Sequence, residues 1–306
     1  MNLGIDLGGT SAKIALVGPG YKIIEQRFVV TAGFPSPSVL ARQMSDACRE
    51  LLRGKKAAHI GIGVAGDIDS ARGIVRVSPN LGWKRVPLKR LMERFLHCRV
   101  SVENDAKAAA WGLYRTQVSP SVKNLLVLTL GTGVGGGIIL NGSVYRGATG
   151  SAGEIGHMII NENGPLCNCG NRGCLETFVG APHITRKVRE DLERGQASSL
   201  QSLVRENPDQ LSPYMLAVAA NNGDAYAQSV WEGVGHALGV ALGNFVYLFN
   251  PEMIYLTGGV SQANRLILTP LWQTLKTRTF KTPIGAVQIK TARGAAHIGV
   301  IGASLL

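Results

Sequence analysis

LGIDLGGTSAKIALV, residues 3–17, is the first of two similar stretches that together indicate the fold. Two apolar runs with the composition of β-strands flank a Gly-Gly-Thr turn. Because Gly8 and Gly9 have no side chains, a phosphate group can approach the backbone N–H groups of this turn closely. Asp6, at the end of the first run, would repel that phosphate unless a cation such as Mg²⁺ lies between them. A single Gly-Gly pair favours a plain hairpin, so the nucleotide interpretation depends on a second copy.

That second copy occurs at residues 124–140, NLLVLTLGTGVGGGIIL. An apolar run again meets a turn rich in Thr and Gly, formed by Gly131, Thr132 and Gly133, and another apolar run follows. Two such hairpins, more than a hundred residues apart, predict a duplicated domain with a nucleotide between its halves. A dinucleotide-binding fold fits less well, because each Gly turn is followed by an apolar β-run and not by a helix.

The stretch at residues 154–176, EIGHMIINENGPLCNCGNRGCLE, contains four candidate metal ligands. These are His157, Cys167, Cys169 and Cys174. Three thiols and one imidazole form a complete tetrahedral set for a structural Zn²⁺. The alternative is a chance cluster of buried thiols, since free cysteine packs as a small hydrophobic residue. Asn, Gly and Arg alternate with these cysteines, which is a poor composition for a core, so the loop predicts a zinc site.

Two acidic residues, Glu154 and Glu176, bracket the cysteine loop. A structural zinc does not need them, and they are suited to accept hydrogen bonds from the hydroxyls of a polyol. The pattern Glu-x-Gly-His, followed by Cys-x-Cys-Gly-x-x-Gly-Cys-x-Glu, resembles the ROK family (repressors, open reading frames and sugar kinases). ROK proteins have the actin-like ATPase fold. The resemblance therefore implies an α/β, duplicated ribonuclease H-like two-domain fold with a zinc-binding loop at residues 154–176.

Residues 99–105 are predicted to form a strand that runs directly into a helix at residues 106–115. A carboxylate at such a junction, Asp105, faces the cleft of an α/β domain. Asn104 or Asp105 could equally well cap the helix, so spacing alone leaves the role open. The Glu-Asn-Asp sequence resembles the ROK motif, and this resemblance implies that Asp105 is the catalytic base, the role that kinases give to an aspartate.

The resemblance covers the chain from Asp6 to the Gly258-Gly259 turn and implies further site residues. Hydroxyl groups of a hexose are expected to contact Asn80, Asn104, Asp105, Glu154, His157 and Glu176. The nucleotide and its Mg²⁺ are expected at Asp6, Gly8, Gly9, Thr10, Lys13, Gly131, Thr132, Gly133, Gly258 and Gly259. One ring nitrogen of His157 can bind zinc while the other reaches a hydroxyl. Loss of the metal is therefore expected to weaken hexose binding more than nucleotide binding.

These residues imply an ATP-dependent hexokinase that phosphorylates the 6-hydroxyl of a hexose, with glucose as the expected substrate. Asp105 would accept the hydroxyl proton. One alternative is a kinase for N-acetylglucosamine or N-acetylmannosamine, since a sequence cannot show a pocket for the acetyl group. A second is a sugar-sensing regulator of the same family, although such regulators carry a helix-turn-helix domain ahead of the first strand. A third is an iron–sulfur activase of the same fold, although this Cys/His pattern suits zinc better.

The composition sets wider limits. A chain of 306 residues with 45% hydrophobic residues is long enough for two domains. The net charge is +12, but Lys and Arg are scattered, so we expect an anionic small ligand and no specific nucleic-acid partner. The use of five cysteines suits a reducing compartment, and no apolar stretch reaches the roughly 20 residues that span a bilayer. We expect a cytoplasmic homo-oligomer, a dimer or tetramer, without membrane contact.

The expected domain organisation follows the two hairpins. We place an N-terminal α/β domain at residues 1–110 and a larger C-terminal α/β domain at residues 111–291. A last helix, within residues 292–306, is expected to pack back on the first domain. His183, His236 and His297 are isolated in the sequence and are interpreted as packing or surface residues.

Overall fold

The computed structural model describes residues 2–34, 36–55, 57, 59–278 and 280–306, and the chain divides into two compact units. Unit 1 contains Met1–Lys123, Gly137–Gly153 and Gly294–Leu306, and unit 2 contains Asn124–Gly136 and Glu154–Arg293. The boundary that we predicted after residue 110 lies inside helix α3 (Asp105–Gln117), which belongs wholly to unit 1. The predicted division into domains at residues 1–110 and 111–291 stays a prediction.

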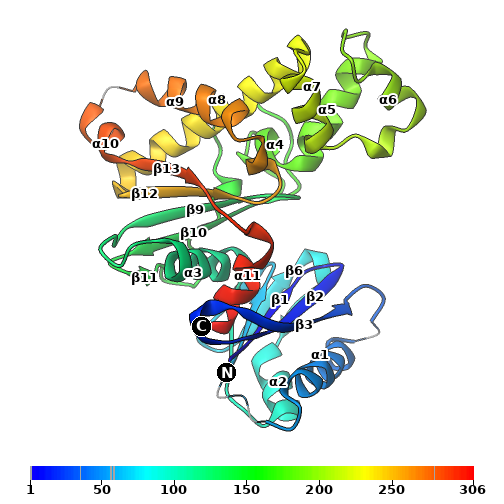
Figure 1. The fold of residues 1–306 in the computed structure, drawn as a ribbon, viewed down its shortest axis with the longest axis vertical. Coiled ribbons are helices and arrows are strands. Elements are labelled where there is room, and N and C mark those ends of the chain that lie inside the picture. The colour runs from blue at the N-terminus through cyan, green and yellow to red at the C-terminus, as the bar shows by residue number, and fades with distance from the viewer. Residues whose placement is uncertain (1, 35, 56, 58, 279) are drawn as a thin grey trace. The chain divides into compact units, whose positions relative to one another are not determined.

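Unit 1 is built on a five-stranded sheet of order β3-β2-β1-β4-β8, of which Figure 1 labels β1, β2 and β3. Its strands are β1 (Asn2–Leu7), β2 (Ser11–Val17), β3 (Ile23–Val30), β4 (Ile60–Val64) and β8 (Val100–Asn104). β2 is antiparallel to β1 and β3, whereas β4 is parallel to β1 and β8. The sequence did not predict β3. This edge strand exposes Ile24, Phe28 and Val30, and polar residues lie between them, so it lacks the pattern of a strand with one buried face.

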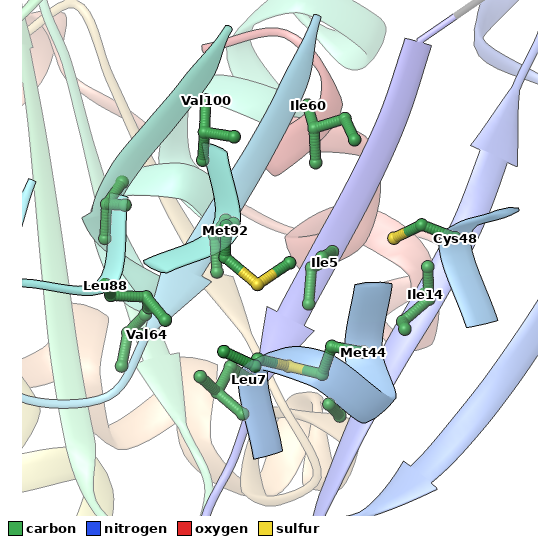
Figure 2. Packing of buried hydrophobic residues seen from close by; sticks show 14 of the residues in the cluster. Ile5, Leu7, Ile14, Met44, Cys48, Ile60, Val64, Leu88, Met92 and Val100 are labelled. Carbon is green, nitrogen blue, oxygen red and sulfur yellow. The ribbon is translucent and has the colours of Figure 1, made fainter. Parts of the chain in front are cut away.

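One face of this sheet forms the core of unit 1 with helices α1 (Pro37–Leu52) and α2 (Leu88–Leu96). Figure 2 shows Ile5 and Ile14 of the sheet among the same side chains as Met44 of α1 and Met92 of α2. All four are fully buried. Burial of each such side chain contributes about 1.5–3 kcal/mol to stability, so this cluster defines which face of the sheet points inward.

The opposite face of the sheet is covered by α11 (Ala295–Ser304), which also packs on α3. Gly4 of β1 and Gly61 of β4 allow this close approach. A Cβ atom would lie 1.9 Å from a backbone oxygen of α11 at Gly4 and 1.8 Å from one at Gly61. Because side chains alternate along a strand, Asp6 points to the same face as Gly4, toward α11.

A small antiparallel sheet of order β5-β6-β7 completes unit 1. Its strands are β5 (Asp67–Asp69), β6 (Ile74–Ser78) and β7 (Trp83–Val86). The 3₁₀ turn η2 (Pro79–Leu81) connects the last two strands, and η1 (Pro19–Tyr21) lies between β2 and β3.

The second sheet has the order β11-β10-β9-β12-β13. Its strands are β9 (Leu125–Leu130), β10 (Val134–Leu140), β11 (Ser143–Val144), β12 (Met253–Thr257) and β13 (Gln288–Thr291). β12 is parallel to β9 and β13, as β4 is parallel to β1 and β8. Strand by strand, this order repeats that of the first sheet, with β9 and β10 in place of β1 and β2. The predicted duplicated α/β fold is confirmed. β10 passes from unit 2 into unit 1 at Gly137.

Unit 2 contains seven helices among the residues that the structure describes. They are α4 (Glu176–Val179), α5 (Ala181–Glu193), α6 (Gln201–Glu206), α7 (Pro213–Asn221), α8 (Ala225–Phe249), α9 (Arg265–Lys276) and α10 (Lys281–Ala286), with 3₁₀ turns η3 (Ile155–His157), η4 (Pro208–Gln210) and η5 (Val260–Ala263). α8 and α9 lie side by side (Figure 1). Their contact depends on Gly235, where a Cβ atom would lie 2.4 Å from Cγ of Pro270. None of the helices in the described ranges is long and apolar enough to cross a bilayer.

Candidate functional site

The turn between β1 and β2 is held by Thr31, which follows β3. The Thr31 hydroxyl donates a hydrogen bond of 2.9 Å to the carbonyl oxygen of Gly8, and its N–H donates one of 3.0 Å to the oxygen of Thr10. Two carbonyl groups of the predicted phosphate turn, those of Gly8 and Thr10, therefore point toward Thr31. Thr31 was not among the predicted residues, because its hydrogen bonds to the turn depend on the edge strand β3, which the sequence pattern did not indicate.

Asn80 lies directly against this turn. A Cβ atom at Gly9 would lie 2.8 Å from Cβ of Asn80 and 2.9 Å from its carbonyl oxygen. Only glycine allows this approach. Unit 1 thus brings Asn80, which we expected to contact a hexose, next to residues that we expected to contact a phosphate.

Asp6 and Lys13 are opposite one another on β1 and β2. Burial raises the pKa of Asp6 from 3.8 to about 6, and the negative charge of Asp105 acts in the same direction, while Lys13 lowers it. The Lys13 ammonium group donates a 2.6 Å hydrogen bond to the backbone oxygen of Ala296 in α11. The pKa values of both neighbouring carboxyl groups, Asp6 and Asp105, are raised. A divalent cation beside them would favour their ionised forms, whose oxygens are the ligands that Mg²⁺ takes. These residues fit the predicted Mg²⁺.

Asn104 is the N-cap of α3. Its side-chain oxygen accepts a 3.1 Å hydrogen bond from the N–H of Lys107, and its side-chain amide donates one of 3.1 Å to the oxygen of Gly66. Asp105, the first residue of the helix, accepts a 2.9 Å hydrogen bond from the N–H of Ala106. Burial raises the pKa of Asp105 despite this hydrogen bond and the charge of Lys107. Since Asn104 supplies the cap, Asp105 has the environment of a proton acceptor.

Glu103, the first residue of the Glu-Asn-Asp motif, is buried and fully paired. Its carboxylate accepts a 2.6 Å hydrogen bond from Nε of Arg146 and one of 2.7 Å from the hydroxyl of Ser70. Nearby, Nζ of the buried Lys107 donates a 2.8 Å hydrogen bond to the oxygen of Gly150. A buried charge needs such partners. Together these bonds attach the segment that contains Arg146 and Gly150 to the junction that contains Asp105, which the sequence did not indicate.

The four predicted metal ligands converge in unit 2. Their ligand atoms, from His157, Cys167, Cys169 and Cys174, all lie within 4.8 Å of one another. Sγ of Cys167 is 3.7 Å from Nδ1 of His157, and Sγ of Cys169 is 3.6 Å from Sγ of Cys174. A tetrahedral Zn²⁺ with its usual bond lengths separates its ligand atoms by about 3.5–3.8 Å. The donor set and the spacing fit zinc.

Tight turns bring these ligands together. Gly170 and Gly173 have φ angles of 94° and 70°, a region that favours glycine. A Cβ atom at Gly173 would lie 1.5 Å from the oxygen of Asn161. The N–H of Cys167 donates a 2.8 Å hydrogen bond to the oxygen of Asn171, which closes the loop. The glycines that the sequence analysis noted in this loop are therefore required by its backbone.

Glu176, the first residue of α4, reaches the second Gly turn. Its Oε2 accepts a 2.8 Å hydrogen bond from the N–H of Val134, and a Cβ atom at Gly133 would lie 2.7 Å from the same oxygen. Its other oxygen, Oε1, is 4.0 Å from Sγ of Cys167. One carboxylate thus contacts both the predicted phosphate turn and the predicted zinc cluster. No sequence signal indicates this contact, because Glu176 and Val134 are 42 positions apart.

The Gly258-Gly259 turn follows β12, and the turn of Gly131, Thr132 and Gly133 follows β9. These two strands are parallel neighbours, so both turns lie at the same edge of the sheet. Gly258 has a φ angle of 93°, and a Cβ atom there would lie 2.3 Å from the oxygen of Leu130 at the end of β9. Thr132 is exposed. Unit 2 thus places the predicted nucleotide residues of both turns together.

The family model of the ROK family matches residues 2–306. The chain belongs to the ROK family. A glucokinase of Thermotoga maritima is 32% identical to it over 303 residues, which cover 99% of this chain and 95% of that one. The crystal structure of a ROK family glucokinase from Streptomyces griseus in complex with glucose and AMPPNP matches with a TM-score of 0.81 at 31% identity, over 99% of this chain and 97% of that one. A ROK family transcriptional regulator, a homologue of the Escherichia coli MLC protein, matches with a TM-score of 0.89 at 26% identity, over 99% and 76%.

Each unit of this ROK protein therefore holds one group of the predicted residues. Unit 1 holds Asp6, Gly8, Gly9, Thr10, Lys13, Asn80, Asn104 and Asp105. Unit 2 holds Gly131, Thr132, Gly133, Glu154, His157, Cys167, Cys169, Cys174, Glu176, Gly258 and Gly259. Glu154 directly precedes η3, and its carbonyl oxygen accepts a 3.1 Å hydrogen bond from the N–H of His157. ROK relatives include kinases and a regulator, so the chemistry of these residues must distinguish the two functions.

Proposed function

We propose that this ROK protein is an ATP-dependent hexokinase, with glucose as substrate and the 6-hydroxyl as phosphoryl acceptor. The environment of Asp105 is the observation that carries the proposal. Asn104 caps α3, so the Asp105 carboxylate is not required for that purpose, and burial raises its pKa. A protein that only senses a sugar has no need of a half-buried carboxylate with a raised pKa. A kinase uses such a group as its base.

In the proposed reaction, Asp105 accepts the proton of the 6-hydroxyl as that oxygen attacks the γ-phosphorus of ATP. The bond between the γ-phosphorus and the bridging oxygen of ADP breaks in line. Asp6 would hold Mg²⁺, which would offset the charge of the phosphate groups. The glucokinase of Thermotoga maritima, 32% identical over nearly the whole chain, supports this reaction class.

The remaining predicted residues are proposed to bind the two substrates. Hydroxyl groups of the hexose are assigned to Asn80, Asn104, Glu154, His157 and Glu176. Phosphate and adenosine groups of the nucleotide are assigned to Gly8, Gly9, Thr10, Lys13, Gly131, Thr132, Gly133, Gly258 and Gly259. Zn²⁺ is assigned to His157 and the three loop cysteines, where it orients the loop. The ammonium group of Lys13 also anchors α11 through the oxygen of Ala296.

A hexose panel tests this proposal. The protein is incubated with ATP, Mg²⁺ and, separately, glucose, N-acetylglucosamine, N-acetylmannosamine, fructose and allose, and the product is identified by mass and by NMR of the phosphorylated position. We expect glucose 6-phosphate as the main product. If an N-acetylhexosamine gives the main product, glucose is not the substrate. If the phosphate is found on another hydroxyl, the 6-hydroxyl is not the acceptor.

A sugar-sensing regulator is the second candidate, because a ROK regulator gives a TM-score of 0.89 with this chain. It predicts hexose binding without phosphoryl transfer. Saturable binding of glucose by calorimetry, together with no product from any hexose in the panel, would support the regulator and overturn the kinase proposal.

A further inference from the structure

Glu176 lies between two parts of unit 2 that have separate proposed tasks. It follows the last loop cysteine, Cys174, by two positions, and it accepts a hydrogen bond of 2.8 Å from the N–H of Val134, which follows the Gly131–Gly133 turn directly. Its side chain therefore connects the proposed zinc cluster with the proposed phosphate turn.

The path from the cluster to Glu176 is short and hydrogen-bonded. The oxygen of Cys174 accepts hydrogen bonds of 3.0 Å from the N–H and 2.8 Å from the hydroxyl of Thr177. The N–H of Leu175 donates a 2.9 Å hydrogen bond to the oxygen of Met158, next to His157. These hydrogen bonds hold the two residues on either side of Glu176 to the cluster segment, Leu175 to Met158 and Thr177 to Cys174.

A second hydrogen bond connects the same segment to the other end of the turn. The N–H of Ala181, the first residue of α5, donates a 2.9 Å hydrogen bond to the oxygen of Gly131. The turn is thus held on both sides, at Gly131 through Ala181 and at Val134 through Glu176. Both partners lie within seven residues of Cys174. The segment that follows the last loop cysteine therefore fixes both ends of the turn that we propose to bind a phosphate.

We infer that Glu176 is a positioning residue that couples zinc binding at the Cys/His cluster to nucleotide binding at the Gly131–Gly133 turn. The inference rests on the proposed function, because it takes this turn as a phosphate site. Coupling between two sites is reciprocal, so zinc raises nucleotide affinity by the same factor by which nucleotide raises zinc affinity. The sequence alone led us to expect an effect of zinc mainly on the hexose.

Zinc affinity tests the link without any nucleotide. A methyl group in Gly133→Ala would lie 2.7 Å from Oε2 of Glu176 and must displace that carboxylate. Gly131→Ala is the matched control, because among the described residues nothing lies within 4 Å of its new methyl group. Neither glycine has a positive φ. Competition with a chromophoric chelator should show zinc affinity lower by about tenfold in Gly133→Ala and nearly unchanged in Gly131→Ala. Equal zinc affinities in both variants would overturn the link.

Nucleotide affinity tests the coupling directly. Calorimetric titration of the full chain with a non-hydrolysable ATP analogue is carried out with zinc bound and after its removal. We expect removal of zinc to weaken analogue binding about tenfold in the wild-type protein. In Glu176→Ala, zinc removal should have little further effect, because the connection is already lost. If zinc removal weakens analogue binding equally in wild type and Glu176→Ala, Glu176 does not connect the two sites. A purely structural role of zinc would give this same result.

The outcomes separate this inference from the proposed function. If hexose phosphorylation and analogue binding are normal but zinc removal leaves analogue affinity unchanged, the coupling fails and the kinase stands. If the zinc-bound protein does not bind the analogue at all, the proposed function fails and the coupling fails with it. If circular dichroism shows that the zinc-free chain unfolds, the zinc affinities of Gly133→Ala and Gly131→Ala decide whether the two sites are coupled.

Discussion

Replacement of Asp6 by asparagine is expected to stabilise the ligand-free protein at neutral pH. The pKa of Asp6 rises from 3.8 to about 6 on folding, chiefly because the carboxyl group is buried. Between those two pH values the folded state binds more protons than the unfolded state, so the stability due to this group falls as pH rises. Above pH 6 the contribution of Asp6 to the free energy of unfolding is therefore about 3 kcal/mol less favourable than at acidic pH, at roughly 1.36 kcal/mol per unit of pKa.

Urea unfolding of wild-type protein and Asp6→Asn, without Mg²⁺ and nucleotide, measures this difference. Asp6→Asn should gain stability relative to wild type as pH increases from 4 to 7, by up to about 3 kcal/mol. Asp209→Asn is the control, because that carboxyl side chain is fully exposed. A difference between wild type and Asp6→Asn that stays constant over this range would refute the argument from burial. If Asp6 also lies beside the phosphates, Asp6→Asn should lose activity while it gains stability.

Two further predictions concern the reaction and the metal. Asp105→Asn should lower kcat by roughly 10² or more without lowering Tm, since burial raises the pKa of this carboxyl group as it does that of Asp6. Asn104→Ala should reduce stability by about 1 kcal/mol through loss of the N-cap. An unchanged kcat in Asp105→Asn would show that the residue is not the base. Cys169→Ser should lower the zinc content measured by atomic absorption, since serine cannot supply a thiolate, and should weaken both hexose and nucleotide binding. Intact binding of both ligands in a zinc-free variant would remove the metal from the mechanism.

The duplicated fold could be predicted because its signals are local. The runs around Gly8-Gly9 and around Gly131–Gly133 each combine two apolar strands with one turn, and each forms a hairpin at the equivalent place in its sheet. The metal ligands could be predicted for the same reason, since three of the four lie within eight positions and the turns between them need glycine.

The contacts that position these groups could not be predicted, because their partners are distant in the sequence. Thr31 reaches the first turn from an edge strand with no clear pattern, and Glu103 is paired with Arg146, 43 positions away. Glu176 was expected to contact a hexose, and its hydrogen bond to Val134 depends on the packing of α4 under the turn. The identity of a side chain is local information, but the partner of a buried charge is a property of the folded chain.

The cover of the first sheet by α11 has a consequence for biosynthesis. All five strands of that sheet have been translated by Asn104, yet the helix that lies against Gly4 and Gly61 begins only at Ala295. Chains emerge from the ribosome N-terminus first, so the part of this face around Gly4 and Gly61 stays uncovered while nearly 200 further residues are made. A polypeptide that ends at residue 293 should bind a hydrophobic dye and be cleaved rapidly by proteases, whereas the full chain should not. The first strand of the protein completes its packing only when the last helix has been synthesised.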